Sequence, residues 1–238
     1  MMRLDKYLCE TGFGTRSEVK AMMKKGLVQV DGETVRRPEQ KIDESAARVV
    51  CGGREAVYQR FVYLMMNKPP GVVSATEDRD QKTVLDLLDG PFPEGIFPAG
   101  RLDKDTEGLL LLTNDGALAH RLLSPKKHVD KVYEAEVLGK VTPEHIRRFA
   151  EGLDIGEKKP TLPAVLEILS PGEESLVRVT VREGKYHQIK RMFEAVGCRV
   201  LRLKRLAMGG LLLDESLQPG AYRALTEDEI RHLKEQNG

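Results

Sequence analysis

Residues 100–116 read GRLDKDTEGLLLLTNDG, and this stretch decides the predicted fold. Its first half is a polar, glycine-bounded loop in which Arg101 and Asp103 stand two positions apart. Four leucines, Leu109 to Leu112, follow closely and are typical of a buried strand. A charged loop at the mouth of a buried strand is a common way for an α/β enzyme to mount a reactive carboxylate. The sequence therefore points to Asp103 as a candidate catalytic residue.

Three interpretations of Asp103 are open from the residues alone. In the simplest, the aspartates of the loop only cap or turn the backbone. In the second, Asp103, Asp105 and Glu107 bind calcium, but Asn114 occupies the position of the bidentate glutamate and leucines fill the positions before it. In the third, Asp103 is a nucleophile with Arg101 beside it. Because the leucines favour a strand over an ion-binding loop, no metal site is predicted.

Composition sets the class of protein. The 238 residues allow one large domain or two smaller ones, and a hydrophobic content of 40% is enough for a core. A net charge of +1 identifies no partner, and the three dispersed cysteines argue against disulfides or structural zinc. No apolar run reaches the length of a signal peptide, or the roughly 20 residues that span a membrane. We therefore expect a soluble cytoplasmic monomer without membrane contact.

Residues 1–48 are predicted to form a small module of helix, helix and hairpin. Apolar spacing predicts a helix over 3–10, and the pair Thr15 and Glu18 matches a capping box for a second helix over 16–25. Gly26 is suited to end that helix. The alternating residues 28–35 surround Asp31-Gly32, which predicts a two-residue hairpin turn.

The remainder of the chain is predicted to be a linker, 49–60, and a second domain, 61–238. Strands are expected at 61–66, 109–113, 132–138, 164–169 and 176–182, and helices at 83–88, 117–123, 143–151, 188–196 and 226–235. Strands and helices mix without strict alternation. The predicted fold class is therefore α+β: a small α/β module joined by a linker to a larger domain with a mostly antiparallel mixed sheet.

Positive charge is concentrated in two places. The predicted helix 16–25 carries Arg16, Lys20 and Lys24 on one face, which suits either contact with phosphates or a solvated surface. Residues 178–205 hold nine cations against two acids, a net charge of +7, so the rest of the chain carries −6. Such segregation predicts a site for a polyanion, with nucleic acid as the simplest case. Tyr186 and Phe193 lie in this window; Phe193 fits a core position, whereas Tyr186 fits either core or surface.

Segments along nearly the whole chain resemble the pseudouridine synthases, in the expected order, and most closely the RsuA branch that modifies small-subunit ribosomal RNA. Residues 3–8 and 28–32 are similar to the S4 RNA-binding domain. The segments similar to motifs of the catalytic domain are 67–71, 100–103 with 106–110, 131–133, and 183–193. The resemblance implies an S4-like domain followed by a pseudouridine synthase domain. It also implies isomerisation of a uridine in small-subunit RNA, at the family's position 516.

The resemblance assigns the chemistry to three residues. Asp103 is the reacting carboxylate, Lys190 is its basic partner, and Tyr133 stacks on a target base that has left the RNA stack. Uridine and pseudouridine are isomers, so no cofactor is expected. The sequence leaves open whether Asp103 attacks C1′, attacks C6 or removes the 2′ proton. It also leaves open a phosphate contact for Lys190 and an ordinary core position for Tyr133.

Other residues are expected to contact RNA. Arg101 would fill the space that the target base vacates or hold a flanking phosphate. The remaining expected contacts are Lys185, His187, Gln188 and Arg191, together with Arg16, Lys20 and Lys24 of the small module. Two alternatives stay open, namely a large-subunit RNA target and a non-catalytic ribosomal-RNA-binding protein on the same scaffold. The segments 186–188 and 220–226 favour the small-subunit branch, and the intact set of three catalytic residues favours an enzyme.

Overall fold

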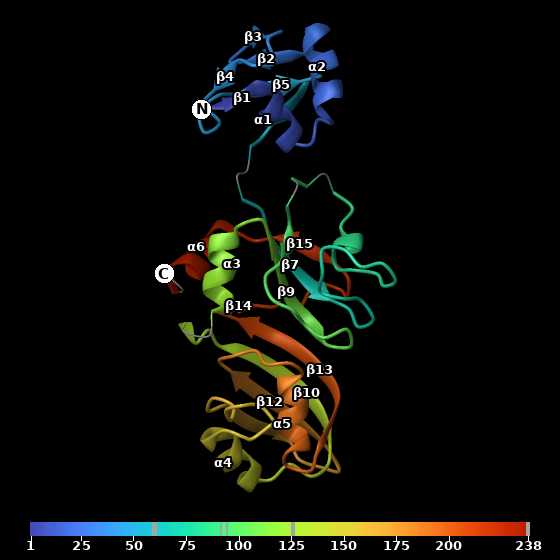
Figure 1. Cartoon of the computed structure of the whole chain (residues 1–238), viewed down its shortest axis with the longest axis vertical. Coiled ribbons are helices and arrows are strands. Elements are labelled where there is room, and N and C mark those ends of the chain that lie inside the picture. The colour runs from blue at the N-terminus through green and yellow to red at the C-terminus, as the bar shows by residue number, and fades with distance from the viewer. Residues whose placement is uncertain (59–60, 91, 94, 125–126, 237–238) are drawn as a thin grey trace. The chain divides into compact units, whose positions relative to one another are not determined.

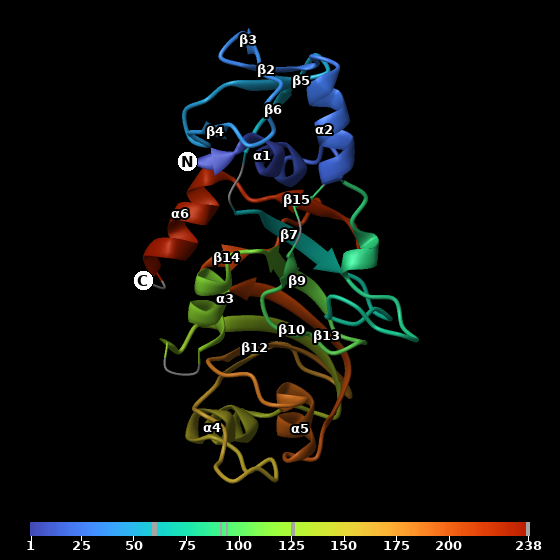
Figure 2. The ribbon, with the colours of Figure 1, turned by 45° about the horizontal axis from the view of Figure 1, so that its top comes forward.

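The structure is a computed structural model and describes residues 1–58, 61–90, 92–93, 95–124 and 127–236. The chain divides into two compact units, whose ribbons appear in Figures 1 and 2. The small unit comprises Met1–Val62 with Asp89–Ile96, and the large unit comprises Tyr63–Leu88 with Phe97–Gly238. Among the described residues, no helix is both long enough and apolar enough to cross a membrane.

The small unit builds one apolar core from two helices and a sheet. Side chains of α1 (Leu4–Glu10) and α2 (Arg16–Lys24) pack with those of the strands in a single buried cluster. The four-stranded sheet has the order β3-β2-β5-β6, formed by β2 (Val28–Val30), β3 (Glu33–Thr34), β5 (Val49–Cys51) and β6 (Arg54–Ala56). A separate two-stranded sheet pairs β1 (Met2–Arg3) with β4 (Lys41–Ile42).

The local signals predicted for this unit are confirmed. Thr15 and Glu18 form the reciprocal capping box at the start of α2. Gly26 follows the end of that helix with φ +73°, a left-handed conformation that glycine adopts without strain. Asp31 and Gly32 both have positive φ, as a type I′ hairpin turn between β2 and β3 requires.

The structure differs from the sequence prediction over the expected linker, 49–60. Residues 49–56 form β5 and β6, and β5 pairs with β2 in the sheet of the small unit. Val49, Cys51 and Ala56 are buried in its core. The pair Gly52-Gly53, interpreted from the sequence as a flexible linker, is the tight turn of the β5–β6 hairpin, with φ of +57° and +78°.

The large unit is built on a nine-stranded sheet in the described part of the chain. Its main order is β11-β12-β10-β13-β9-β7-β15, with β14 beside β13 and β8 beside β9. Every described pair of its strands is antiparallel except β9 with β13, which confirms the mostly antiparallel mixed sheet. The strands are β7 (Tyr63–Lys68), β8 (Phe97–Pro98), β9 (Glu107–Thr113), β10 (Lys131–Leu138), β11 (Val165–Ser170), β12 (Glu174–Val181), β13 (Arg199–Met208), β14 (Leu211–Leu212) and β15 (Tyr222–Ala224).

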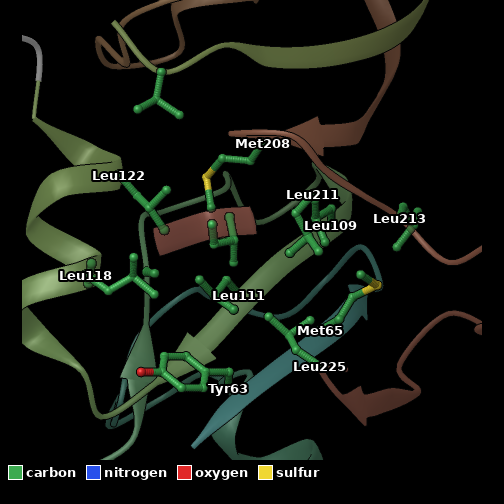
Figure 3. Close-up of a cluster of buried hydrophobic side chains, with 14 residues drawn as sticks. Tyr63, Met65, Leu109, Leu111, Leu118, Leu122, Met208, Leu211, Leu213 and Leu225 are labelled. Carbon is green, nitrogen blue, oxygen red and sulfur yellow. The ribbon is translucent and has the colours of Figure 1, made fainter. Parts of the chain in front are cut away.

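Helices cover the sheet of the large unit. They are α3 (Gly116–Leu123), α4 (Pro143–Glu151), α5 (Gln188–Glu194) and α6 (Glu227–Gln236). Figure 3 shows Leu118 and Leu122 of α3 facing the leucines of β9, in a core that also takes in Met65 of β7. The prediction of a helix at 83–88 is wrong: only a single 3-10 turn, η1 (Leu85–Leu87), forms there, and Leu88 is already extended.

The parallel pair β9–β13 sets the position of the loop that precedes β9. At this junction Gly108 lies against Arg205, and a Cβ atom on Gly108 would stand only 2.3 Å from the Arg205 carbonyl oxygen. The Arg205 side chain is buried, and its Nε donates to the carbonyl of Leu109 at 2.7 Å. This close approach fixes where the polar loop 100–106 leaves the sheet.

Candidate active site

A pocket of the large unit collects most of the side chains predicted to act on RNA. Asp103, Tyr133 and Lys190 line it together, although they come from the loop before β9, from β10 and from α5. The full lining is Arg101, Leu102, Asp103, Thr106, Tyr133, Val181, Glu183, Gly184, Lys185, His187, Gln188, Ile189, Lys190 and Leu203. Of the expected RNA contacts, Arg191 does not line this pocket, and Arg16, Lys20 and Lys24 lie exposed on α2 of the small unit.

Lys190 is shared between two carboxylates. Its Nζ lies 3.2 Å from Asp103 Oδ2 and donates to Asp105 Oδ1 at 2.6 Å. Burial lowers the pKa of Lys190, but the hydrogen bond to Asp105 and the charge of Asp103 outweigh it, so the pKa is raised overall. Lys190 is therefore a cation at neutral pH. The sequence predicted the partnership with Asp103 but not the competition from Asp105.

Burial opposes ionisation of Asp105, yet its hydrogen bond to Lys190 keeps its pKa below the usual value. Glu107 is held by a different cation, since Arg202 donates to both of its carboxylate oxygens at 2.8 and 3.0 Å. Asp103, Asp105 and Glu107 thus face ammonium and guanidinium groups, which is the opposite of a calcium site. No group of three potential metal ligands occurs among the described residues.

His187 approaches Asp103 from the other side. Its Nε2 lies 3.7 Å from Asp103 Oδ1, and the residue precedes the first turn of α5 with φ +47°. A left-handed conformation is uncommon for a residue with a side chain and is typical of positions where the surrounding structure fixes an orientation. Asp103 therefore has a basic group on each of its two oxygens.

Tyr133 lies on β10 with only 8% of its surface exposed. The pairing of β10 with β13 shifts register between Val132 and Tyr133, which is a local irregularity of the bulge type. Bulges beside binding sites re-aim a side chain, and here the tyrosine faces the pocket. The nearby Thr106 is also buried, and its hydroxyl oxygen has no hydrogen-bond partner among the described residues.

The loop that carries Asp103 is held from behind by a lysine that sequence reasoning did not select. Lys68, at the end of β7, is fully buried and donates to the carbonyls of Pro69, Lys104 and Thr106 at 3.0, 3.2 and 2.8 Å. Burial lowers the pKa of Lys68 to about 8. In the sequence, the segment 67–71 resembles a family motif, and the buried strand that runs straight into this lysine is a further signal for it.

Ser74 fixes the same loop at a second point. Its hydroxyl donates to the carbonyl of Leu102 at 3.0 Å and accepts from the Leu102 backbone N–H at 3.1 Å. With Lys68, it ties the backbone on both sides of Asp103. These hydrogen bonds fix the backbone that carries the Asp103 carboxylate.

The opposite wall of the pocket, loop 183–188, is tied together by its own polar groups. Gln188 accepts from the backbone N–H of Lys185 at 2.9 Å and donates to Glu183 at 3.1 Å. The Lys185 ammonium donates to the carbonyls of Lys159 and Pro160 at 2.8 and 2.9 Å. Lys185 and Gln188, expected to contact RNA, thus use these polar atoms to shape the loop.

The cationic window 178–205 carries less free charge than its sequence indicated. Acidic side chains from outside the window pair with Arg178, Arg182, Lys190, Arg191 and Arg202. All of these partners lie outside the window, so a count of charges within 178–205 does not include them. Arg205 is buried and bonds to backbone. Many of the cations in the window are therefore neutralised by ion pairs.

Comparison with known proteins gives two matches to family models. Residues 62–195 match the model for RNA pseudouridylate synthase, and residues 2–47 match the model for the S4 domain. A solved structure described as a pseudouridylate synthase shares 39% sequence identity and has a TM-score of 0.69. The match covers 98% of this chain and 100% of the chain in that structure.

Full-length relatives carry names of the same kind. A protein of Bacillus subtilis named as an uncharacterized RNA pseudouridine synthase is 50% identical, over 98% of this chain and 99% of its own length. Ribosomal small subunit pseudouridine synthase A of Vibrio cholerae is 43% identical, over 98% of this chain and 99% of its own length. The Escherichia coli protein of that name is 42% identical, over 96% of this chain and 98% of its own length.

Proposed function

The chain belongs to the RNA pseudouridylate synthase family, and on that premise we propose that it isomerises one uridine of small-subunit ribosomal RNA, with Asp103 as the reacting carboxylate. The observation that carries the proposal is the placement of Asp103 in the pocket, 3.2 Å from Lys190 and beside Tyr133. The names of the Vibrio and Escherichia relatives support the small-subunit target. Position 516 is the uridine we propose within it.

The reaction moves one bond within the nucleotide. The bond between N1 of uracil and C1′ of ribose breaks, the base turns, and C5 bonds to C1′. C5 loses its proton and N1 gains one, by direct transfer or by exchange with water. Atoms and electrons balance without a redox partner. A carboxylate that stays ionised in a partly buried pocket serves such chemistry, because it can form a bond to an electrophilic carbon or stabilise developing positive charge.

Each nearby group has a definite task in this scheme. Lys190 and His187 oppose the carboxylate oxygens of Asp103, while Lys68 and Ser74 hold its loop in place. The target base must leave its stack to enter the pocket, and the Tyr133 ring then packs against it. Arg101 is exposed at the pocket and takes the place of the missing base or holds a flanking phosphate. All of these groups are supplied by this chain, and we propose that it acts as a monomer.

The decisive experiment maps pseudouridine in ribosomal RNA from cells that lack the protein. We expect loss at one small-subunit uridine, restored by the wild-type gene but not by Asp103→Asn. Asp80→Asn is the matched control, since it makes the same change at an exposed carboxylate of the large unit that does not line the pocket, and it should restore the modification. Loss at a large-subunit uridine would keep the chemistry and overturn the substrate.

A second arm excludes redundancy between enzymes. The purified wild-type protein, incubated with transcribed small-subunit RNA or with particles containing it, should form pseudouridine at the same site. A protein that binds these RNAs but modifies none of them would support the non-catalytic alternative and contradict the proposal.

A further inference from the structure

We propose that Tyr186 and His187 form a stacking platform at the rim of the active-site pocket, which receives the base of a nucleotide next to the target uridine. The inference rests on the proposed function and adds to it a contact with the RNA outside the target uridine. It begins with the exposure of Tyr186, which leaves 73% of its surface in solvent. A tyrosine ring offers a large apolar face and a polar hydroxyl, which suits it to a contact surface.

The ring of Tyr186 is already stacked on one side. Its centroid lies 3.9 Å from that of the His187 imidazole, and the two planes are inclined by only 15°. His187 lines the pocket, with its Nε2 near Asp103, so the pair leads from the pocket wall to the surface. The exposure of Tyr186 leaves its opposite face open to a further ring. In the proposed complex, the base next to the uridine held at Asp103 stacks on this open face.

The platform is fixed before any ligand arrives. Arg191 donates to the Tyr186 carbonyl at 3.1 Å and also binds Glu157 and the carbonyl of Ile155. The left-handed conformation of His187 and the Lys185–Gln188 bond hold the same turn. A ring whose backbone is fixed loses little conformational freedom on binding, which favours affinity.

Charge beside the platform suits an RNA backbone. Loop 156–160 lies next to it, because Arg191 binds Glu157 and Lys185 binds the Lys159 carbonyl. Lys158 and Lys159 are both exposed, and within the described residues neither forms an ion pair. An open aromatic face with cations beside it is the arrangement by which proteins bind unpaired bases with their phosphates.

The test measures isomerisation and binding on short RNA hairpins that contain the target uridine. Tyr186→Ala should lower kcat/KM about tenfold or more, through KM rather than kcat, since stacking on an aromatic side chain has that magnitude. Tyr186→Phe should retain the wild-type value, because the ring and not the hydroxyl makes the contact. Leu212→Ala is the matched control: Leu212 is also exposed, at 69%, but lies on β14 and not in the loop 183–188 that forms a wall of the pocket, and its removal should change nothing.

Altered RNA identifies the contacted base. With an abasic site at the contacted neighbour, wild type and Tyr186→Ala should become equal, whereas an abasic site on the other side of the target should preserve the difference. Equal activity of both proteins on the intact RNA would overturn the platform. A loss that persists with abasic sites at both neighbours would also overturn it, in favour of a purely structural role.

A fluorescence arm separates this inference from the proposed function. The probe is 2-aminopurine at the contacted neighbour, bound to the Asp103→Asn protein so that the RNA stays unconverted. Its fluorescence should be quenched when Tyr186 is present and recover in the Tyr186→Ala background. Quenching without isomerisation by wild type would refute the proposed enzyme while keeping the platform; isomerisation without Tyr186-dependent quenching would refute only the platform.

Discussion

At the residue scale, the Lys190 ammonium lies between two carboxylates, 3.2 Å from Asp103 and 2.6 Å from Asp105. Lys190→Met should reduce kcat by about 100-fold or more, because Asp103 would lose its closest positive charge. Lys190→Arg should retain most of the rate, since it keeps the charge. Single-turnover assays at saturating RNA measure the effect. An unchanged rate for Lys190→Met would show that Lys190 serves another purpose, such as a phosphate contact.

Some residues of the site could be predicted from the sequence, and the contacts of others could not. Asp103, Tyr133 and Lys190 stand in recognisable motifs, and the structure brings all three to one pocket. The buried strand before Lys68 marks this lysine as unusual, but its contacts cannot be predicted from the sequence because all three acceptors are backbone carbonyls. The sharing of Lys190 with Asp105 is equally invisible, since it depends on how a loop and a helix 85 residues apart meet.

At the element scale, the junction of β9 and β13 depends on a residue without a side chain. Gly108→Ala should cost at least about 2 kcal/mol of unfolding free energy, because Gly108 has φ +97° and a methyl group would meet the Arg205 backbone. Gly116→Ala is the control: nothing lies within 4 Å of the added atom, and the free energy should stay equal or rise slightly. Urea titrations of both variants supply the comparison, and equal midpoints would contradict the close approach.

Elements with clear periodicity were predictable and others were not. The strands expected at 132–138 and 176–182 are present as β10 and β12. The strand β13 was not predicted because its apolar alternation is interrupted by Arg199, Arg202, Lys204 and Arg205. Arg205 is buried only through tertiary contacts, which the sequence does not reveal. The strands β5 and β6 are three residues each, too short for any period to emerge.

At the scale of the whole molecule, the two units are expected to divide RNA docking from chemistry. Replacing Arg16, Lys20 and Lys24 of α2 together by glutamine should weaken RNA binding. The slope of log K against log salt concentration should become shallower by about two to three, because fewer ions are released on binding. The rate at saturating RNA should not change. A matched triple variant that exchanges arginine and lysine at these positions keeps the charge and should bind as the wild type does. Titrations at several salt concentrations measure this, and identical slopes for all three proteins would remove α2 from the RNA interface.

The division into units was predictable in outline, and its boundary was not. A helical module with a hairpin could be identified from Thr15, Asp31 and Gly32, and the S4 match covers the same region. The boundary predicted at residue 48 is too early, because a glycine pair is typical both of a flexible connection and of a tight hairpin turn. Experiments that trim this region should therefore leave residues 49–56 with the small unit.

The wide separation of the site's two walls along the chain has a consequence for the order of folding. Lys190 and Asp105 are 85 residues apart, and Arg202 and Glu107 are 95 apart. Bringing such distant segments together has an entropic cost that local helices and hairpins do not bear, so contacts of this kind tend to form late. During synthesis, the Asp103 loop must emerge long before the strand and helix that complete it. We therefore expect the nascent chain to fold its small RNA-binding unit first. The active site is completed only when loop 183–188 and α5, which form the opposite wall of the pocket, have emerged.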